Sequence, residues 1–253
     1  MRLSRRHPRY ASLVVRGRLA DAMRSGLVVP EGLIAQGRGE AFDYLLGERT
    51  SPSARRAERV AAQWLLAADR PVVSVNGNVA ALASGEVAGL QRAVPGLAVE
   101  VNLFHRTASR AALVAGALRR AGVKEVLGLR PTARIPHLPS DRARVDARGI
   151  LQADVCVVPL EDGDRAEALR RLGKRVISID LNPLSRTNRA ADLPIVDELT
   201  RGLRGIATAA RRLPAGNRSG SFEPFDARAT LDAALLELDR RLRRLARQRA
   251  RPR

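Results

Sequence analysis

Amides, carboxylates and arginines follow four short apolar runs of the chain. The four polar segments are Asn76–Asn78, Asn102–Thr107, Glu161–Arg165 and Asp180–Thr187. Guanidinium groups are planar forks that can bind phosphate and carboxylate groups through two parallel hydrogen bonds. We therefore expect these segments to bind small anions, with solvated surface residues as the alternative in so arginine-rich a chain. The arginines concerned are Arg106, Arg165 and Arg186.

The first segment, Asn76-Gly77-Asn78, suits a phosphate group in particular. Its central glycine lets the backbone approach a ligand closely. The segment can also open a helix, and the first N–H groups of a helix bind phosphate readily. An ordinary turn with a helix cap is the alternative interpretation.

Acidic residues in two of the segments suit a metal ion and a nucleotide. Asp162 and Asp164 are close enough in sequence to hold Mg²⁺ together with substrate phosphates, with helix capping or salt bridging as the alternative. Asp180 and Asn182 could contact a ribose or a base edge. His105 is a candidate acid or base, although a lone histidine after a strand is more often structural.

A pair of glycines further upstream surrounds another arginine. Gly37-Arg38-Gly39 begins like the dinucleotide motif G-x-G-x-x-G, but Phe42 stands where the third glycine belongs and no apolar run precedes it. We interpret it as a flexible segment that presents Arg38 to a phosphate. The motifs G-x-x-x-x-G-K-[ST], H-E-x-x-H and G-x-S-x-G are absent, and the histidines at 7, 105 and 137 are not at metal-ligand spacing.

Short apolar runs rich in valine and isoleucine would position these segments. Most of them are separated by helical stretches, over 86–94, 107–121 and 165–172. This alternation indicates an α/β fold, a Rossmann-like parallel sheet with helices on both faces. Ligands of such sheets bind beyond the carboxyl ends of the strands, where the four polar segments would meet. The predicted strands are Val72–Val75, Leu97–Val101, Val126–Leu129, Asp154–Val158, Val176–Ile179 and Leu193–Val196.

We expect residues 1–212 to form one α/β domain, with a helical N-terminal part over 1–70 and the sheet core over 71–212. A linker with two prolines and two glycines follows over 213–225. Residues 226–253 then form a basic amphipathic C-terminal helix and tail. Its leucines share one side, which is more typical of core or dimer packing than of a membrane face. These are Leu231, Leu235, Leu238, Leu242 and Leu245.

The net charge of +19 lies largely at the two ends of the chain. Residues 240–253 carry +8 and residues 1–9 carry +4, which leaves +7 for the 230 residues between them. Aromatic residues make up only 3% of the chain, so no stacking platform for single strands is predicted. We therefore expect no nucleic acid partner, although the basic tail alone could bind a polyanion weakly.

Cysteine content and the length of the apolar runs indicate the cellular compartment of the protein. Cys156 is the single cysteine, which excludes a disulfide framework and suits the reducing cytoplasm. The longest apolar runs fall far short of the roughly 20 residues that a membrane-spanning helix needs. We therefore expect a cytoplasmic protein without a membrane partner.

Seven strings of residues, in order along the chain, resemble those of one enzyme family. They are His7-Pro8-Arg9-Tyr10 with Arg16, Gly37-Arg38-Gly39-Glu40-Ala41-Phe42-Asp43-Tyr44-Leu45, Ser74-Val75-Asn76-Gly77-Asn78-Val79-Ala80-Ala81-Leu82, Glu100-Val101-Asn102-Leu103-Phe104 with Arg106-Thr107, Ala133-Arg134-Ile135-Pro136, Val158-Pro159-Leu160-Glu161-Asp162-Gly163-Asp164-Arg165 and Ile179-Asp180-Leu181-Asn182-Pro183-Leu184-Ser185-Arg186. In these strings the chain resembles archaeal phosphopantothenate synthetase, the 4-phosphopantoate–β-alanine ligase family. The arginine-rich tail lies outside the resemblance.

The resemblance implies an ATP-dependent ligase of archaeal-type coenzyme A biosynthesis. In that family ATP activates 4-phosphopantoate to an acyl-adenylate with release of diphosphate, with Mg²⁺ as the expected metal. The amine of β-alanine then attacks, giving 4′-phosphopantothenate and AMP. The resemblance further implies a homodimer with a Rossmann-like fold.

The resemblance also carries over ATP contacts, residue by residue. These fall on Arg16, Arg38, Asp180, Leu181, Asn182, Arg186, Thr187, Glu198 and Leu199. For 4-phosphopantoate and β-alanine, the positions at strand ends predict Asn76, Asn78, Asn102, Arg106, Asp162 and Arg165. Among all of these we expect four catalytic residues, namely Arg38, Asn76, Asp162 and Arg186.

Two departures and two rival functions accompany this interpretation. Gln36 stands where relatives are expected to have histidine, and Glu198 where they are expected to have asparagine. A glutamine can form hydrogen bonds but cannot titrate. The rival functions are a nucleotide-binding protein without ligase activity and an RNA-binding protein that acts through its basic ends.

Overall fold

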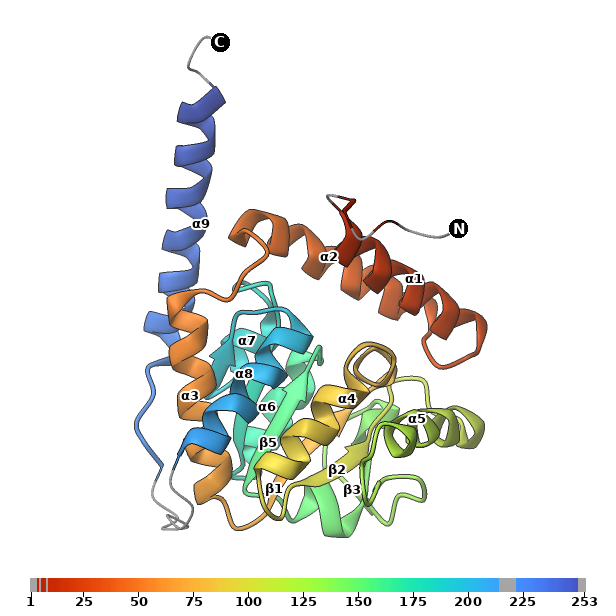
Figure 1. Ribbon diagram of the computed structural model, residues 1–253. Coiled ribbons are helices and arrows are strands. Elements are labelled where there is room, and N and C mark those ends of the chain that lie inside the picture. Colours follow the sequence, from red (N-terminus) through yellow and green to blue (C-terminus); the bar gives the residue numbers. More distant parts are fainter. Residues whose placement is uncertain (1–3, 5, 8, 214–221, 250–253) are drawn as a thin grey trace.

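Five parallel strands form the central sheet of the computed structural model, which describes residues 4, 6–7, 9–213 and 222–249 (Figure 1). Their order across the sheet is β2-β1-β5-β6-β7, and Val73 of β1 pairs with Val99 of β2 and Val157 of β5. All five carboxyl ends therefore lie at one edge. The strands are β1 (Pro71–Val75), β2 (Ala98–Val101), β5 (Val155–Pro159), β6 (Arg175–Ile179) and β7 (Leu193–Ile195).

Successive residues of each strand enter different hydrophobic cores on the two faces of the sheet. Val73 and Ile177 pack on one face with α3 (Pro52–Ala67), α4 (Gly77–Ala93), α5 (Ala108–Arg120) and α8 (Leu199–Arg212). Val72 and Val176 pack on the other face, where the sheet is covered by α6 (Gly163–Arg171), α7 (Arg186–Ala190) and the segment from β3 to the π-helix at Ala147–Leu151. The predicted parallel sheet with helices on both faces is confirmed.

Three helices lie outside these two layers. The N-terminal helices α1 (Tyr10–Arg24) and α2 (Pro30–Leu46) cross the carboxyl edge of the sheet, and α9 (Ala227–Arg249) extends away from the body beside the end of α2 (Figure 1). The leucines of α9 divide along the helix. Those at 231, 235 and 238 pack with Leu46 and Leu181, whereas Leu242 and Leu245 are exposed.

One predicted strand is wrong. Val126–Leu129 contributes only an isolated parallel bridge, in which Leu127 pairs with Glu100 of β2. Gly128 turns the chain away with φ of +79°, and a side chain there would lie 2.4 Å from the carbonyl oxygen of Val101. The chain next forms a short antiparallel pair, β3 (Ala133–Arg134) with β4 (Arg144–Val145). No apolar run in the sequence predicts this pair.

The predicted linker over 213–225 falls partly on 214–221, outside the described residues. Its last part is anchored on α3, because the indole N–H of Trp64 donates to the carbonyl oxygen of Glu223 at 2.8 Å. Phe222 stacks edge-on against the same ring, with centroids 6.0 Å apart. None of the helices in the described part of the chain is long and apolar enough to cross a membrane.

Candidate functional site

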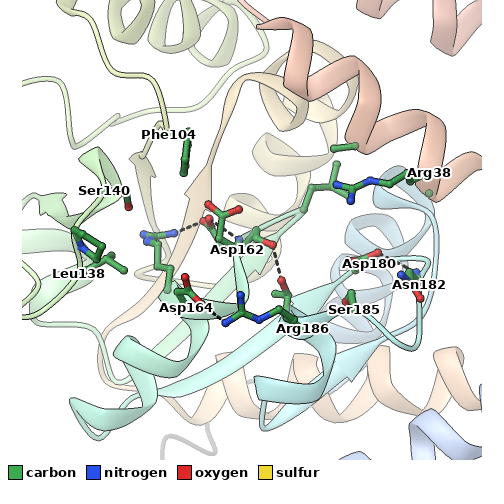
Figure 2. Close-up of a pocket in the computed structure, with 18 residues that line it drawn as sticks. Arg38, Phe104, Leu138, Ser140, Asp162, Asp164, Asp180, Asn182, Ser185 and Arg186 are labelled. Atoms are coloured by element: carbon green, nitrogen blue, oxygen red, sulfur yellow. Dashed lines mark hydrogen bonds and ion pairs between the residues drawn. The ribbon is translucent and has the colours of Figure 1, made fainter.

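A cavity of about 710 Å³, which we call the main cavity of the site, opens at the carboxyl ends of β5 and β6 (Figure 2). Helix α2 covers it and contributes Arg38, which faces Asp162 on one side and Asp180 on the other. Charged and polar side chains dominate its walls. The lining residues are Ala35, Arg38, Gly39, Phe104, Leu138, Pro139, Ser140, Leu160, Glu161, Asp162, Gly163, Asp164, Arg165, Asp180, Asn182, Ser185, Arg186 and Thr187.

A smaller cavity of about 270 Å³ adjoins the main cavity at the start of α4. The two share Ala35, Arg38, Phe104, Leu160 and Asp162 as lining residues. Their common walls make one cleft with two compartments. The smaller compartment is lined in addition by Val29, Glu31, Gly32, Asn76, Gly77, Asn78, Leu103, His105, Arg110 and Arg142.

Asn76 fixes the floor between the compartments. Its side-chain oxygen accepts from the N–H of Val79 at 3.0 Å and so caps α4. Its amide nitrogen donates to the carbonyl oxygens of Pro159 and Leu160, at 3.1 and 3.0 Å. Leu160 has φ of +49°, a conformation that non-glycine residues seldom adopt. Asn76 therefore ties the end of β1 to a strained turn after β5, and it lines the smaller compartment while its side chain bonds to the protein.

A buried ion cluster lies beneath the cleft. Glu161 accepts from the guanidinium groups of Arg142 and Arg165, and all three side chains are almost completely buried. Arg165 also donates to the Ser74 hydroxyl at 3.0 Å, while its Nε and Nη2 are buried without a hydrogen-bond partner in the described structure. Burial of this kind is tolerated only because the opposite charges are paired. Glu161 thus holds two cations in the wall of the cleft.

Asp162 continues this cluster into both compartments. Its carboxylate lies 2.9 Å from Nε of Arg142 and remains 49% exposed. Burial raises the pKa of Asp162 above its ordinary value, and the charge of Arg142 partly opposes that increase. Arg142 therefore stabilises the charged form of this carboxylate.

The outer wall of the main cavity is made by the starts of α6 and α7. Arg186 pairs with Asp164 at the surface, and the hydroxyl of Thr187 donates to the carbonyl oxygen of Glu161. The two helices approach closely because residue 163 is glycine: a Cβ there would lie 2.5 Å from that of Arg186. This contact brings two of the predicted polar segments together.

Asp180 and Asn182 form the far end of the main cavity. Asp180 accepts from the N–H of Asn182 at 2.9 Å, and Asn182 accepts from that of Leu184 at 2.9 Å. Burial raises the pKa of Asp180, while the N–H of Asn182 and the charge of Arg38 oppose the increase. The carboxylate therefore lies under the influence of Arg38 from across the cavity.

The structure brings nine of the predicted site residues into the cleft. These are Arg38, Asn76, Asn78, Asp162, Arg165, Asp180, Asn182, Arg186 and Thr187. Six others line neither compartment, namely Arg16, Asn102, Arg106, Leu181, Glu198 and Leu199. Their predicted ligand contacts stay predictions.

Three of these six side chains form hydrogen bonds or ion pairs with other residues of the chain. Arg16 pairs with Glu40 at 3.0 Å on the outer side of α1 and α2. Asn102 is fully buried and donates to the carbonyl oxygens of Arg142 and Arg144. Arg106 donates to the carbonyl oxygens of Gly128 and Leu129.

Two of the other three lie at the start of α8, and the third lies after β6. Glu198 caps α8 by accepting from the N–H groups of Thr200 and Arg201. Leu199 is buried at the start of that helix, and Leu181 is buried against α9. Helix capping and core packing therefore explain the positions of these three side chains, and no bound ligand is needed to explain them.

Sequence reasoning missed two arginines of the cleft. Arg142 comes from the short 3₁₀ helix at Asp141–Ala143, in a region without a periodic pattern. Arg110 lies in the first turn of α5, which Thr107 caps by accepting from the N–H of Arg110 at 3.1 Å. That cap was readable in the sequence and turns Arg110, one helical turn after Arg106, into the smaller compartment.

Fold and site together define an α/β protein with a charged, arginine-lined cleft at the carboxyl edge of a parallel sheet, the edge at which ligands of such sheets bind. Residues 53–241 match the family model of phosphopantothenate/pantothenate synthetase. The chain therefore belongs to this family.

Similar proteins come from archaea. The chain is 49% identical to the 4-phosphopantoate–β-alanine ligase of Thermococcus onnurineus, over 97% of this chain and 95% of the relative. It is 48% identical to the ligase of the same name from Methanosarcina mazei, over 95% of each chain. The corresponding protein of Methanospirillum hungatei is 55% identical over 79% of this chain and 82% of its own length.

Proposed function

We propose that this protein is an ATP-dependent 4-phosphopantoate–β-alanine ligase. The activity named for relatives that match almost the whole chain supports this proposal. The observation that carries it is the two-compartment cleft. A reaction between ATP and a second phosphorylated acid requires two adjoining anion sites, and Arg38 lines both compartments.

The reaction has two steps. The carboxylate of 4-phosphopantoate attacks the α-phosphorus of ATP, forming a phosphoric anhydride to AMP and releasing diphosphate. The amine of β-alanine then attacks the activated carbonyl carbon, forms the amide bond, loses a proton and releases AMP. The products are 4′-phosphopantothenate, AMP and diphosphate, as in archaeal-type coenzyme A biosynthesis.

Each compartment suits one of the phosphorylated substrates. In the main cavity we assign the triphosphate to Arg38 and Arg186, and the ribose or base to the segment from Asp180 to Asn182. Such cations stabilise the charge that develops on the phosphates and align the attacking carboxylate. The smaller compartment, beside Asn76 and Asn78, is left for the acid. The floor that Asn76 builds then holds the two reactants next to each other.

The carboxylates of Asp162 and Asp164 would hold Mg²⁺, which would neutralise charge on the phosphates of ATP. Both side chains line the main cavity and are about half exposed. Each is paired with one arginine, so oxygen lone pairs remain for a cation. Among the described residues no three His, Cys, Asp or Glu side chains form a metal site, so the nucleotide would supply the remaining ligands.

We further propose that the protein acts as a cytoplasmic homodimer. Support for the dimer comes from the exposed leucines 242 and 245 on α9, which a second copy would cover. The buried, unpaired Cys156 suits a reducing compartment. Light scattering coupled to size-exclusion chromatography measures the oligomeric state, and a mass of one chain would refute the dimer.

Product analysis tests the ligase proposal. Purified protein with ATP, Mg²⁺ and 4-phosphopantoate should release diphosphate and form AMP when β-alanine is added, and 4′-phosphopantothenate should appear in equal amount. Omission of any one substrate is the control. A nucleotide-binding protein without ligase activity would bind ATP but form no amide, and this result would refute the proposal.

A further inference from the structure

We propose that the smaller compartment holds the phosphoryl group of the acid substrate and that Arg110 is the residue that recognises it. This inference rests on the proposed function and adds a specificity-determining residue to it. Neither the sequence motifs nor the names of the relatives assign a role to Arg110.

The guanidinium of Arg110 is fixed in place before any ligand binds. Its Nε donates to the carbonyl oxygen of Leu27 at 3.2 Å, and its Nη1 donates to that of His105 at 2.6 Å. Its Nη2 has no partner among the described residues, and the side chain lines the smaller compartment. A cation that is already oriented binds an anion without a further loss of side-chain entropy.

Gly77 allows Arg110 to reach the start of α4. A side chain at this position would lie 2.9 Å from Nη2 of Arg110 and 2.5 Å from the carbonyl oxygen of Leu27. The neighbouring N–H groups of Gly77 and Asn78 have no acceptor in the described structure, whereas those of Val79 and Ala80 bond to Asn76. The residues that carry this unpaired guanidinium edge and these two free N–H groups all line the smaller compartment.

The charges around this space favour an anion. Burial is the main cause that lowers the pKa of Arg110, and the positive charge of Arg142 lowers it further. Glu31 is the carboxylate that opposes this effect, but its side chain is 65% exposed, and its attraction is screened by water. Arg142 has Glu161 and Asp162 as close partners, whereas Arg110 has no carboxylate within ion-pair distance among the described residues. A phosphoryl dianion would supply the missing charge.

An independent feature of the compartment matches the rest of the acid. Asn78 is only 7% exposed, and its amide nitrogen donates to the carbonyl oxygen of Gly32 at 2.7 Å. This bond fixes the orientation of the amide, and its Oδ1 accepts no hydrogen bond from a described residue. This oxygen is therefore available to accept from a ligand, and the hydroxyl of 4-phosphopantoate is a suitable donor. Val29 and Leu103 offer apolar contact for its two methyl groups.

Binding measurements on two variants test the role of Arg110. Arg110→Met keeps most of the side-chain volume but removes the charge, and Arg110→Lys keeps the charge but loses the planar fork. Isothermal titration calorimetry gives Kd for 4-phosphopantoate, for unphosphorylated pantoate and for ATP. Loss of a hydrogen bond between charged groups predicts about 10- to 100-fold weaker binding of 4-phosphopantoate by the methionine variant, and a smaller loss for the lysine variant.

Specificity for the phosphoryl group separates recognition from a structural role. We expect Arg110→Met to bind ATP as the wild type does and to bind 4-phosphopantoate about as weakly as the wild type binds pantoate. Arg119→Met, an exposed arginine in the last turn of α5, is the matched control and should change none of these constants. If the methionine variant does not fold, the lysine variant decides by the same comparison.

Two outcomes would overturn the inference. One is an unchanged Kd for 4-phosphopantoate in Arg110→Met, and the other is an equal weakening for 4-phosphopantoate and ATP in both variants. Wild-type turnover is measured separately. If the wild type forms 4′-phosphopantothenate but the Arg110 variants bind 4-phosphopantoate normally, only the role of Arg110 is refuted. Absence of turnover in the wild type would instead refute the proposed function.

Discussion

Replacement of Arg38 should reduce catalysis without reducing stability. Arg38 lines both compartments, and its guanidinium makes no hydrogen bond or ion pair with another residue in the described part of the chain. Arg38→Met therefore removes no protein contact of that group. We expect the free energy of unfolding to change by less than about 0.5 kcal/mol, as for other surface substitutions.

The effect on turnover follows from the same geometry. Arg38 is the only arginine common to the two compartments within the described residues, so it can stabilise the charge that moves from the acid to the phosphate. Loss of one such contact costs about 2 to 4 kcal/mol of transition-state stabilisation. This corresponds to a reduction of kcat/KM by about 30- to 900-fold.

A diphosphate-release assay at saturating β-alanine measures this reduction, and urea unfolding of the same preparations measures stability. Arg56→Met, on the exposed side of α3, is the matched control and should behave as the wild type does. Near-normal turnover of Arg38→Met would refute the assignment of Arg38 to the reaction. A large loss of stability would instead refute the claim that its charge serves ligands alone.

Three further predictions concern the stability of the protein and its C-terminal tail. Asn76→Ala should destabilise the protein by about 2 to 4 kcal/mol in urea unfolding, because a helix cap and two buried hydrogen bonds are lost; Asn76→Ser, which keeps a cap, should recover about 1 kcal/mol, and equal losses would contradict this division. Burial and the neighbouring Asp197 raise the pKa of Glu58 from 4.5 to about 8, so the folded protein holds a proton that the unfolded chain releases between these values. Stability should therefore fall as the pH rises through this range, by at most about 1.4 kcal/mol per pH unit, and Glu58→Gln should flatten the slope; identical slopes would show that Glu58 is ionised when folded. Deletion of residues 240–253 should leave turnover largely intact, and a loss of RNA binding with this deletion would favour the rival function.

The sequence predicted the site through the ends of its strands. Runs such as Val72–Val75 are apolar because both faces of a parallel strand are buried, so the polar residues that follow them mark the carboxyl edge. The glycine pair around Arg38 predicted a further phosphate contact, but the prediction of a flexible segment is wrong, because residues 37–39 lie within helix α2. Val126–Leu129 is also apolar, but Gly128 within it has a positive φ and approaches the carbonyl oxygen of Val101 closely, so that the segment pairs with β2 through a single bridge.

Residues that depend on tertiary contacts could not be predicted in this way. Arg142 reaches the cleft because the segment from β3 to β4 folds back over β2 and the buried Asn102 bonds to two of its carbonyl oxygens. Arg106 was predicted to bind a substrate because it follows β2, but its guanidinium donates to the carbonyl oxygens of Gly128 and Leu129. Neither pairing has a local sequence signal.

The unpartnered arginines of the cleft have a practical consequence for work with this protein. Arg38 and the free edge of Arg110 face an open compartment of about 270 Å³, and dianions such as inorganic phosphate or sulfate match them in charge and hydrogen bonding. Phosphate-buffered solutions would therefore compete with substrates and give apparent affinities that are too low. The choice of buffer enters directly into every constant measured at this site, and organic zwitterionic buffers at low ionic strength are the appropriate reference condition.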